Sequence, residues 1–215
     1  KLLPLAYAEA IKTHDIKPVI NPKIHVEKLE DPGANKDWQF TALTCEAPIV
    51  NLNNYKDVIK SVTAKSKIIV PGKPFDSAQG RQDIKFEEIV KALFESVTCK
   101  IPGILVDNET DKLLSQTLDD VKKLGLTLDQ YLSSTGKNPE ILRAEYHAKA
   151  ENDIKLEFAL QKIAEEEKIA VSAKEIDEAI QKAKSDQEKK NLENNKYLLA
   201  SILRQQRTLD FLKNL

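Results

Sequence analysis

The side chains that most often carry enzyme chemistry are few in this sequence and lie far apart. The three histidines are His14, His25 and His147, and none has a partner at the spacing of a catalytic triad or a metal site. The two cysteines, Cys45 and Cys99, form neither a disulfide framework nor a metal-binding spacing. No HExxH, GxSxG or P-loop motif occurs. We therefore expect no catalytic residues, no metal and no cofactor.

A long helix that begins at Pro139 carries the first indication of a binding function. At about 100° per residue its apolar side chains fall on two nearly opposite faces. One face holds Leu156, Ala159, Leu160 and Ile163, and the other holds Tyr146, Ala150, Ile154 and Phe158. Because a surface helix usually has one apolar stripe, this helix is either sandwiched in a core or packs on one side and offers the other to a partner. The sandwich is the commoner arrangement, and the sequence leaves both open.

Start and stop signals define the helices around it. One helix runs from Pro102 to Gly125, with an apolar stripe of Val106, Leu113, Leu114, Val121 and Leu124. A short helix follows, capped by Thr127 with Gln130 as a capping box and ended by Gly136. Asn138 and Pro139 then open the long helix. Ser172 and Glu175 predict a second capping box, and a closing helix presents Leu198, Leu199, Ile202, Leu209 and Leu212 on one face.

The first part of the chain predicts a smaller mixed region. Residues 2–14 have helical spacing, residues 23–30 and 38–47 alternate as strands do, and a turn is expected at 31–33. Residues 58–70 read as strand or irregular structure, residues 71–83 as a linker, and residues 86–97 as a helix again. We expect a mainly α fold with a small α+β N-terminal part, divided into residues 1–57, a linker or extended segment at 58–85, and a helical domain at 86–215.

Composition excludes several classes of partner. The 33 basic and 34 acidic residues nearly cancel, and no Lys/Arg block predicts nucleic-acid binding. No apolar run approaches the ~20 residues of a membrane span, and no signal-peptide pattern opens the chain. We expect a cytoplasmic protein. The chain has no Met and begins at Lys1 inside a helical pattern, which leaves open whether upstream sequence or only an initiator is missing.

Several stretches together resemble trigger factor, the bacterial ribosome-associated chaperone. The C-terminal part of that family is similar to IPGILVDNETDKLL, LGLTLDQYL and AKAENDIKLEFALQKIAEEEKIAVSAKEIDEAI. The later part of its N-terminal domain is similar to YAEAIKTHDIKPVINPKIHVEKLE and DWQFTALTCEAPIVNLNNYKD. The resemblance covers roughly residues 1–57 and 86–215. It implies a helical peptide-binding C-terminal domain of the trigger factor and SurA type.

The resemblance also implies features that this chain does not show. The family combines a ribosome-docking N-terminal domain, an FKBP-like prolyl isomerase domain and a helical domain with two arms. The docking signature, a Gly-Phe-Arg-type loop, would lie upstream of Lys1, so the ribosome is expected as a partner only if such a loop precedes this chain. The isomerase would have to fit in residues 58–83, whereas an independent domain needs at least ~50 residues.

The resulting expectation is an ATP-independent holdase that binds unfolded or nascent polypeptides and assists folding and export. The apolar surface of its helical cradle would be the binding site, with candidate residues Tyr146, Ile154, Phe158, Leu198, Leu199, Ile202, Leu113 and Leu114. Each of these side chains could equally be core. Two alternatives remain: a peptidyl-prolyl isomerase, as in full-length relatives, and a helical adaptor with one defined partner.

Overall fold

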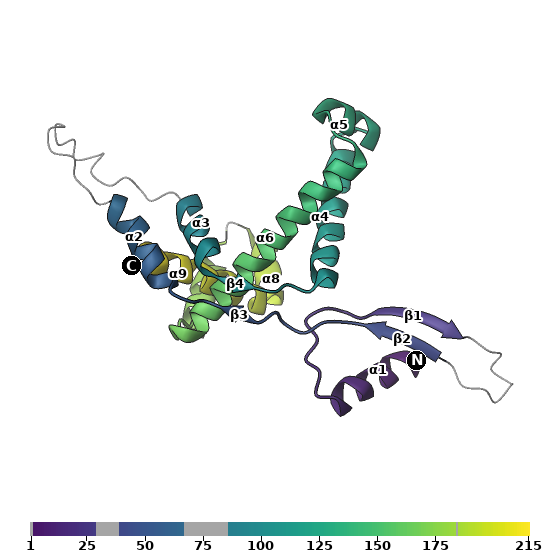
Figure 1. Cartoon of the computed structure of the whole chain (residues 1–215), viewed down its shortest axis with the longest axis horizontal. Helices are drawn as coiled ribbons and strands as arrows, with labels where there is room; N and C mark the ends of the chain where they lie inside the picture. Colours follow the sequence, from purple (N-terminus) through teal and green to yellow (C-terminus); the bar gives the residue numbers. More distant parts are fainter. Residues whose placement is uncertain (1, 29–38, 67–85, 184) are drawn as a thin grey trace. The chain divides into compact units, whose positions relative to one another are not determined.

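A computed structural model describes residues 2–28, 39–66, 86–183 and 185–215. The chain forms two compact units, and each combines segments that are far apart in the sequence. Unit 1 consists of Lys1–Ile49 and Lys100–Asn152, and unit 2 of Val50–Cys99 and Asp153–Leu215. Nine helices and four short strands make up the described residues (Figure 1), so the expected mainly helical fold with a small α+β part is confirmed.

The N-terminal part of unit 1 is a helix beside a two-stranded ribbon. Helix α1 spans Leu2–Thr13, and strands β1 (Lys23–Lys28) and β2 (Gln39–Leu43) pair antiparallel. Every residue of β1 is exposed, because a ribbon of two strands has little to pack against. The expected turn at 31–33 and the start of the second strand at Trp38 lie outside the described residues.

The rest of unit 1 is a helical hairpin with a short helix at its tip (Figure 1). It contains α4 (Gly103–Lys123), α5 (Leu128–Thr135) and the first part of α6 (Pro139–Glu166). The predicted local signals hold: Thr127 forms a capping box with Gln130, and Gly136 takes a left-handed φ of 65°. The side chain of Asn138 accepts from the backbone N–H of Ile141 at 2.7 Å.

Two contacts tie α4 to α6 in this hairpin. The hydroxyl of Thr117 lies 2.7 Å from that of Tyr146, and Arg143 pairs with Asp111 at 3.1 Å. Only part of the apolar stripe expected on α4 is buried. Val106 and Val121 are buried, whereas Leu124 at the end of the helix is 75% exposed, because the chain turns away there into α5.

Unit 2 contains the main hydrophobic core. It is formed by α2 (Tyr55–Ser66), α3 (Phe86–Ser96), the second part of α6 and the end of α9 (Lys196–Lys213). Strands β3 (Val50–Asn51) and β4 (Thr98–Cys99) pair antiparallel beside it. Helix α3 buries Ile89, Ala92, Leu93 and Ser96, which is one helical face.

Helix α2 corrects the sequence interpretation. Residues 58–66 were expected as strand or irregular structure, but they continue the helix that starts at Tyr55. The β-branched residues in this stretch suggested a strand, yet Tyr55, Ile59 and Thr63 recur every four residues and are all buried. Burial of this face against the core outweighs weak helix propensity. The expected linker at 71–83 lies outside the described residues.

A polar network joins α2 to the end of α6. The hydroxyl of Tyr55 donates to Glu167 at 2.9 Å, and Lys56 pairs with the same carboxylate oxygen at 2.6 Å. The hydrogen bond from Lys56 lowers the pKa of Glu167, aided by Tyr55. Burial, together with the bond to Glu167, raises the pKa of Tyr55 far above its usual range. The network therefore favours an ionised Glu167 and a neutral Tyr55.

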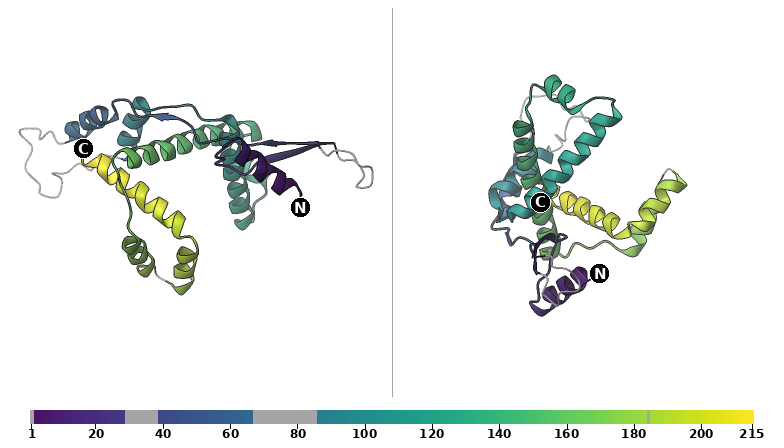
Figure 2. Two further views of the ribbon diagram at one scale, coloured as in Figure 1. Left: turned by 90° about the horizontal axis from the view of Figure 1, so that it is seen from below. Right: turned by 90° about the vertical axis from the view of Figure 1, so that its right-hand side faces the viewer.

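The end of the chain forms a three-helix segment in unit 2. Helices α7 (Ala173–Gln181) and α8 (Asp186–Asn194) contact each other and α9. Figure 2 shows α9 in yellow, close to the label of the C-terminus. The predicted capping box at Ser172 and Glu175 is confirmed. The highly charged stretch at 186–194 forms α8, which buries no side chain among its described residues.

Candidate functional site

Helix α9 carries one apolar stripe that changes environment along its length. The stripe comprises Leu198, Ile202, Leu209 and Leu212, which recur at helical spacing. At the C-terminal end Leu212 is fully buried in the core, with Leu209 packed beside it. At the N-terminal end Leu198 is 61% exposed and Ile202 is 50% exposed. We call this N-terminal half, which contains Leu198 and Ile202, the open half of α9.

A pocket adjoins the open half. It lies between α6 and α9, is closed on a third side by the segment that joins α6 to α7, and has a volume of about 430 Å³. Leu198 and Ile202 each stand three residues from a pocket residue, Ser201 and Gln205 respectively. Leu198 and Ile202 do not line the pocket themselves, but residues three apart are neighbours on a helix surface. The exposed apolar edge therefore lies next to the pocket, and we call the two together the α6–α9 site.

The lining of the pocket combines apolar and polar side chains. Small side chains on both helices, Ala164 and Ala200, leave the space open. The apolar part also includes Leu160, Ile169, Ala170 and Val171, and the polar part consists of Glu157, Gln161, Ser201, Arg204, Gln205 and Thr208. A lining with both apolar side chains and amide groups suits a polypeptide, whose side chains are buried while its backbone groups need hydrogen-bond partners.

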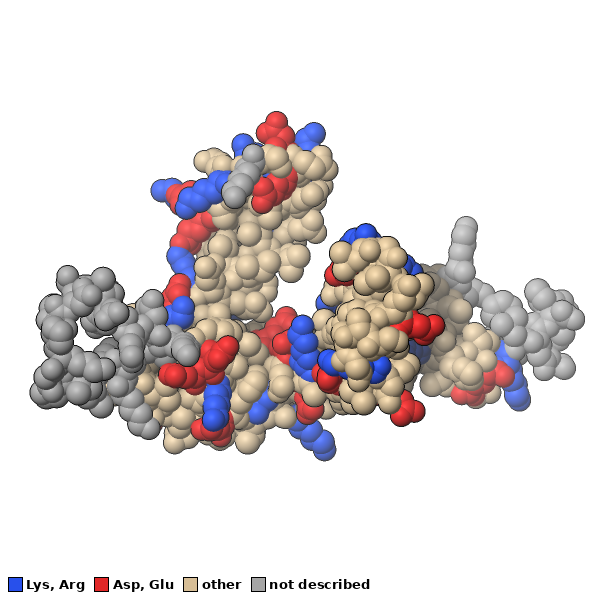
Figure 3. All heavy atoms as spheres, turned by 90° about the horizontal axis from the view of Figure 1, so that it is seen from above, with Lys and Arg blue, Asp and Glu red and all other residues tan. Residues whose placement is uncertain are grey.

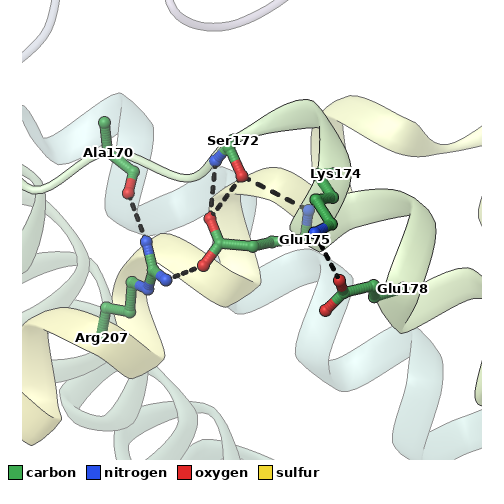
Figure 4. A network of polar contacts seen from close by, with 6 residues as sticks. All are labelled: Ala170, Ser172, Lys174, Glu175, Glu178 and Arg207. Atoms are coloured by element: carbon green, nitrogen blue, oxygen red, sulfur yellow. Dashed lines mark hydrogen bonds and ion pairs between the residues drawn. The ribbon is translucent and has the colours of Figure 1, made fainter.

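Two arginines of α9 hold the third wall of this pocket. Arg204 Nε donates to the carbonyl of Ile169 at 2.9 Å, and Arg207 Nη1 donates to the carbonyl of Ala170 at 2.6 Å. Arg207 also pairs with Glu175 (Figure 4). We call these contacts the arginine clasp.

The other candidate residues of unit 2 on α6, Ile154 and Phe158, are buried or packed against the core. Ile154 is only 5% exposed, and Phe158 packs against the core of unit 2. Ala150, Ala159, Leu160 and Ile163 are buried as well. Both faces of α6 are thus covered along this stretch, as in a sandwiched helix. Ile154 is therefore not part of a surface that a client could touch in this structure.

The remaining candidates divide between the two units. In unit 1, Leu113 and Leu114 on α4 are half-buried, as is Tyr146 on α6. In unit 2, Leu199 is half-buried on α9 beside the exposed Leu198 and Ile202. The structure thus brings together the three candidates of α9 and, separately, those of the unit 1 hairpin.

Sequence reasoning missed the two arginines and the pocket that they border. The sequence carries no local signal for these contacts, because Ile169 and Ala170 lie beyond the turn at 167–168 that follows α6, and the arginines lie more than thirty residues further along the chain. Sequence reasoning also missed an exposed apolar group at the tip of the unit 1 hairpin, formed by Leu124, Leu126, Leu128 and Ile141. Of these residues, only Leu124 belongs to an apolar stripe predicted from the sequence, as the last member of the stripe of its helix.

The α6–α9 site holds no group arranged for covalent or acid–base chemistry. Neither His nor Cys lines the pocket. Burial raises the pKa of both Cys45 and Cys99 elsewhere in the chain, which keeps the thiols protonated and poorly nucleophilic. Within the described ranges no cluster of His, Cys, Asp and Glu side chains could hold a metal ion. The site is suited to binding.

The charged side chains on one face of the molecule are of both signs (Figure 3). On the face drawn in Figure 3, basic and acidic side chains alternate along the described part of the molecule. Nucleic-acid binding usually requires a basic patch or stripe, and that face offers none. Among the described residues, no helix is long and apolar enough to cross a bilayer.

Comparison with known proteins decides the family. A family model described as the C-terminus of bacterial trigger factor protein matches residues 77–214, and a second model, described as bacterial trigger factor protein, matches residues 1–70. The chain belongs to the bacterial trigger factor family. The resemblance found in the sequence is thereby confirmed.

Individual trigger factors are similar over most of this chain. Trigger factor of Shouchella clausii is 24% identical over 191 residues, which is 89% of this chain and 38% of the relative. That of Listeria monocytogenes is 28% identical, covering 83% of this chain and 40% of the relative. That of Staphylococcus epidermidis is 25% identical, covering 89% and 43%. The chain thus spans about two fifths of the length of these trigger factors.

One solved structure is also similar, and it is described as showing domains of trigger factor from Thermotoga maritima. It is 22% identical, covers 60% of this chain and 79% of its own chain, and has a TM-score of 0.46.

Proposed function

We propose that this chain is an ATP-independent chaperone that holds unfolded or nascent polypeptides at the α6–α9 site and so assists folding and export. Membership of the trigger factor family supports a chaperone role in general. The observation that carries the specific proposal is the open half of α9, where Leu198 and Ile202 continue a core stripe into solvent beside a pocket. We expect this activity in the cytoplasm.

The energetics favour weak and reversible binding. Apolar surface contributes about 25 cal/mol for each Å² removed from water. The lost freedom of the two partners and the ordering of a flexible client offset much of that gain. A site of this size would therefore bind with a Kd on the order of micromolar. Such an affinity suits a holdase, because the client must leave again to fold.

Membership of the family raises the question of one further partner, the ribosome, and one further activity, prolyl isomerisation. The ribosome is proposed as a partner on family likeness alone. Prolyl isomerisation is not proposed for this stretch of chain. The two matched ranges leave only residues 71–76 between them, and an independent domain needs at least ~50 residues. An isomerisation assay on a proline peptide tests this, and catalysis by the purified chain would contradict it.

The proposal is tested by suppression of client aggregation. The chain at an equimolar ratio should keep a chemically denatured client soluble after dilution. The double variant Leu198→Ser with Ile202→Ser should bind about tenfold more weakly, since two apolar side chains no longer leave water on binding.

A matched control removes equally exposed apolar side chains elsewhere. Leu5 is 67% exposed and Ile49 is 80% exposed, both in unit 1. Leu5→Ser with Ile49→Ser should suppress aggregation as the parent chain does. Absence of suppression by the folded parent, or full suppression by the α9 variant, would contradict the proposal. A tight saturable complex with one folded protein and indifference to denatured clients would favour an adaptor.

A further inference from the structure

We propose that Arg204 and Arg207 are positioning residues that hold the third wall of the pocket and make its affinity for clients fall as ionic strength rises. This inference rests on the proposed function, because an unfolded client is what the wall would enclose. The contacts that carry it concern the wall itself and can be measured without any client.

The wall is a segment where regular helix has ended. Lys168 adopts a left-handed φ of 54°, and the N–H of Ile169 donates to the carbonyl of Ala164 at 2.8 Å, which closes α6. The chain then runs through Ala170 and Val171 before Ser172 caps α7. Ile169, Ala170 and Val171 all line the pocket, so the position of this short segment sets the width of the pocket.

The arginine clasp fixes that segment from α9. The carbonyls of Ile169 and Ala170 accept from Arg204 and Arg207 respectively. Arg207 uses its other terminal nitrogen to bond Glu175 (Figure 4). The planar guanidinium of Arg207 can donate to the Ala170 carbonyl and to the Glu175 carboxylate at once. A lysine ammonium on a flexible stem does this less well.

Glu175 extends the clasp into the start of α7. Its second carboxylate oxygen accepts from both the N–H and the hydroxyl of Ser172, each at 2.8 Å. One carboxylate therefore completes the capping box and anchors Arg207 (Figure 4). The wall is held at one side by carbonyl contacts to α9 and at the other by a helix cap that is also bonded to α9.

These bonds are charged and partly open to solvent, and this makes them sensitive to salt. The side chains of Arg207 and Glu175 are 46% and 34% exposed, so ions screen their attraction. A wall that is already in place favours binding, whereas a loosened wall must be ordered when the client arrives. Apolar contact alone is not weakened by salt, and excluded salts strengthen it. Weaker client binding at high salt therefore distinguishes a clasped wall from a purely apolar site.

Hydrogen exchange on the whole chain tests the clasp directly. In the double variant Arg204→Gln with Arg207→Gln, amides of residues 168–172 should exchange about tenfold faster, because each lost charge-assisted bond lowers the cost of local opening. Residues 89–96 of α3 should exchange as in the parent chain. Arg207→Lys should give an intermediate rate. Lys174→Gln, which removes only the 3.9 Å pair with Glu178 on α7, is the matched control and should change nothing in the wall.

Client binding at two salt concentrations completes the test. Between about 50 mM and about 500 mM NaCl the affinity of the parent chain for a denatured client should fall about threefold, whereas that of the double variant should stay constant. Unchanged exchange at 168–172, or equal acceleration in α3, would overturn the inference. If the parent chain binds no client at all, the proposed function fails, and the exchange result still decides the clasp.

Discussion

The two halves of α9 have the same apolar spacing and opposite environments. At the C-terminal end Leu212 is fully buried by helices of unit 2, and at the N-terminal end Leu198 is 61% exposed beside a pocket. Partly exposed arginine bonds hold the segment beside the pocket that adjoins the open half. An apolar stripe is therefore buried only where other helices or strands pack against it. Where they do not, the same spacing leaves a surface available to another chain.

The largest expected effect is a difference in stability between variants of the two halves of α9. Leu212→Ala should lower the free energy of unfolding by about 2–5 kcal/mol, because it leaves a cavity in a packed core. Leu198→Ala should change it by no more than about 0.5 kcal/mol, as exposed substitutions usually do. Urea unfolding of both variants measures the difference. Similar losses in the two variants would mean that the halves of α9 are not distinct.

Helix caps provide the next comparison, between unit 1 and unit 2. Thr127→Ala and Ser172→Ala should each cost about 1 kcal/mol of stability, since each removes a capping hydroxyl. Only Ser172→Ala should also speed hydrogen exchange in residues 168–172, because only this cap is bonded to a residue that pairs with α9. Equal exchange in both variants would show that the cap at Ser172 is purely local.

The smallest effect concerns pH and the contact between α2 and α6. Because the pKa of Glu167 is lowered in the folded state, its contribution is present above the unfolded pKa of about 4.3 and is lost as pH falls through the folded value. Glu167→Gln should cost up to about 1 kcal/mol at neutral pH, given partial solvent screening. The cost should shrink as the pH is lowered from about 5 towards about 2. Urea unfolding of both proteins across this pH range measures how the free energy of unfolding depends on pH. The same pH dependence in parent and variant would contradict the prediction.

Much of the fold could be predicted from local signals in the sequence. The capping boxes at Thr127 and Ser172 and the left-handed turn at Gly136 depend on neighbouring residues, and the structure contains all three. Helix α2 could not be predicted, because its β-branched residues have weak helix propensity and only burial of Tyr55 and Ile59 in the core favours the helix.

The site was less accessible to sequence reasoning than the fold. Periodicity placed Ile154 and Leu198 on apolar faces, but it could not show that one is buried and the other exposed, since exposure depends on which helices pack nearby. The roles of Arg204 and Arg207 depend on carbonyls more than thirty residues away, brought close only by folding. Those contacts leave no spacing pattern in the chain.

Site-specific crosslinking to a denatured client tests the central claim most directly. A photoreactive phenylalanine analogue placed at Ile202, in the open half of α9, is compared with the same analogue at Ile49, which is 80% exposed in unit 1. Binding at the α6–α9 site predicts strong crosslinks from position 202 and few from position 49. Equal crosslinking at both positions, or crosslinks from position 49 alone, would contradict the account.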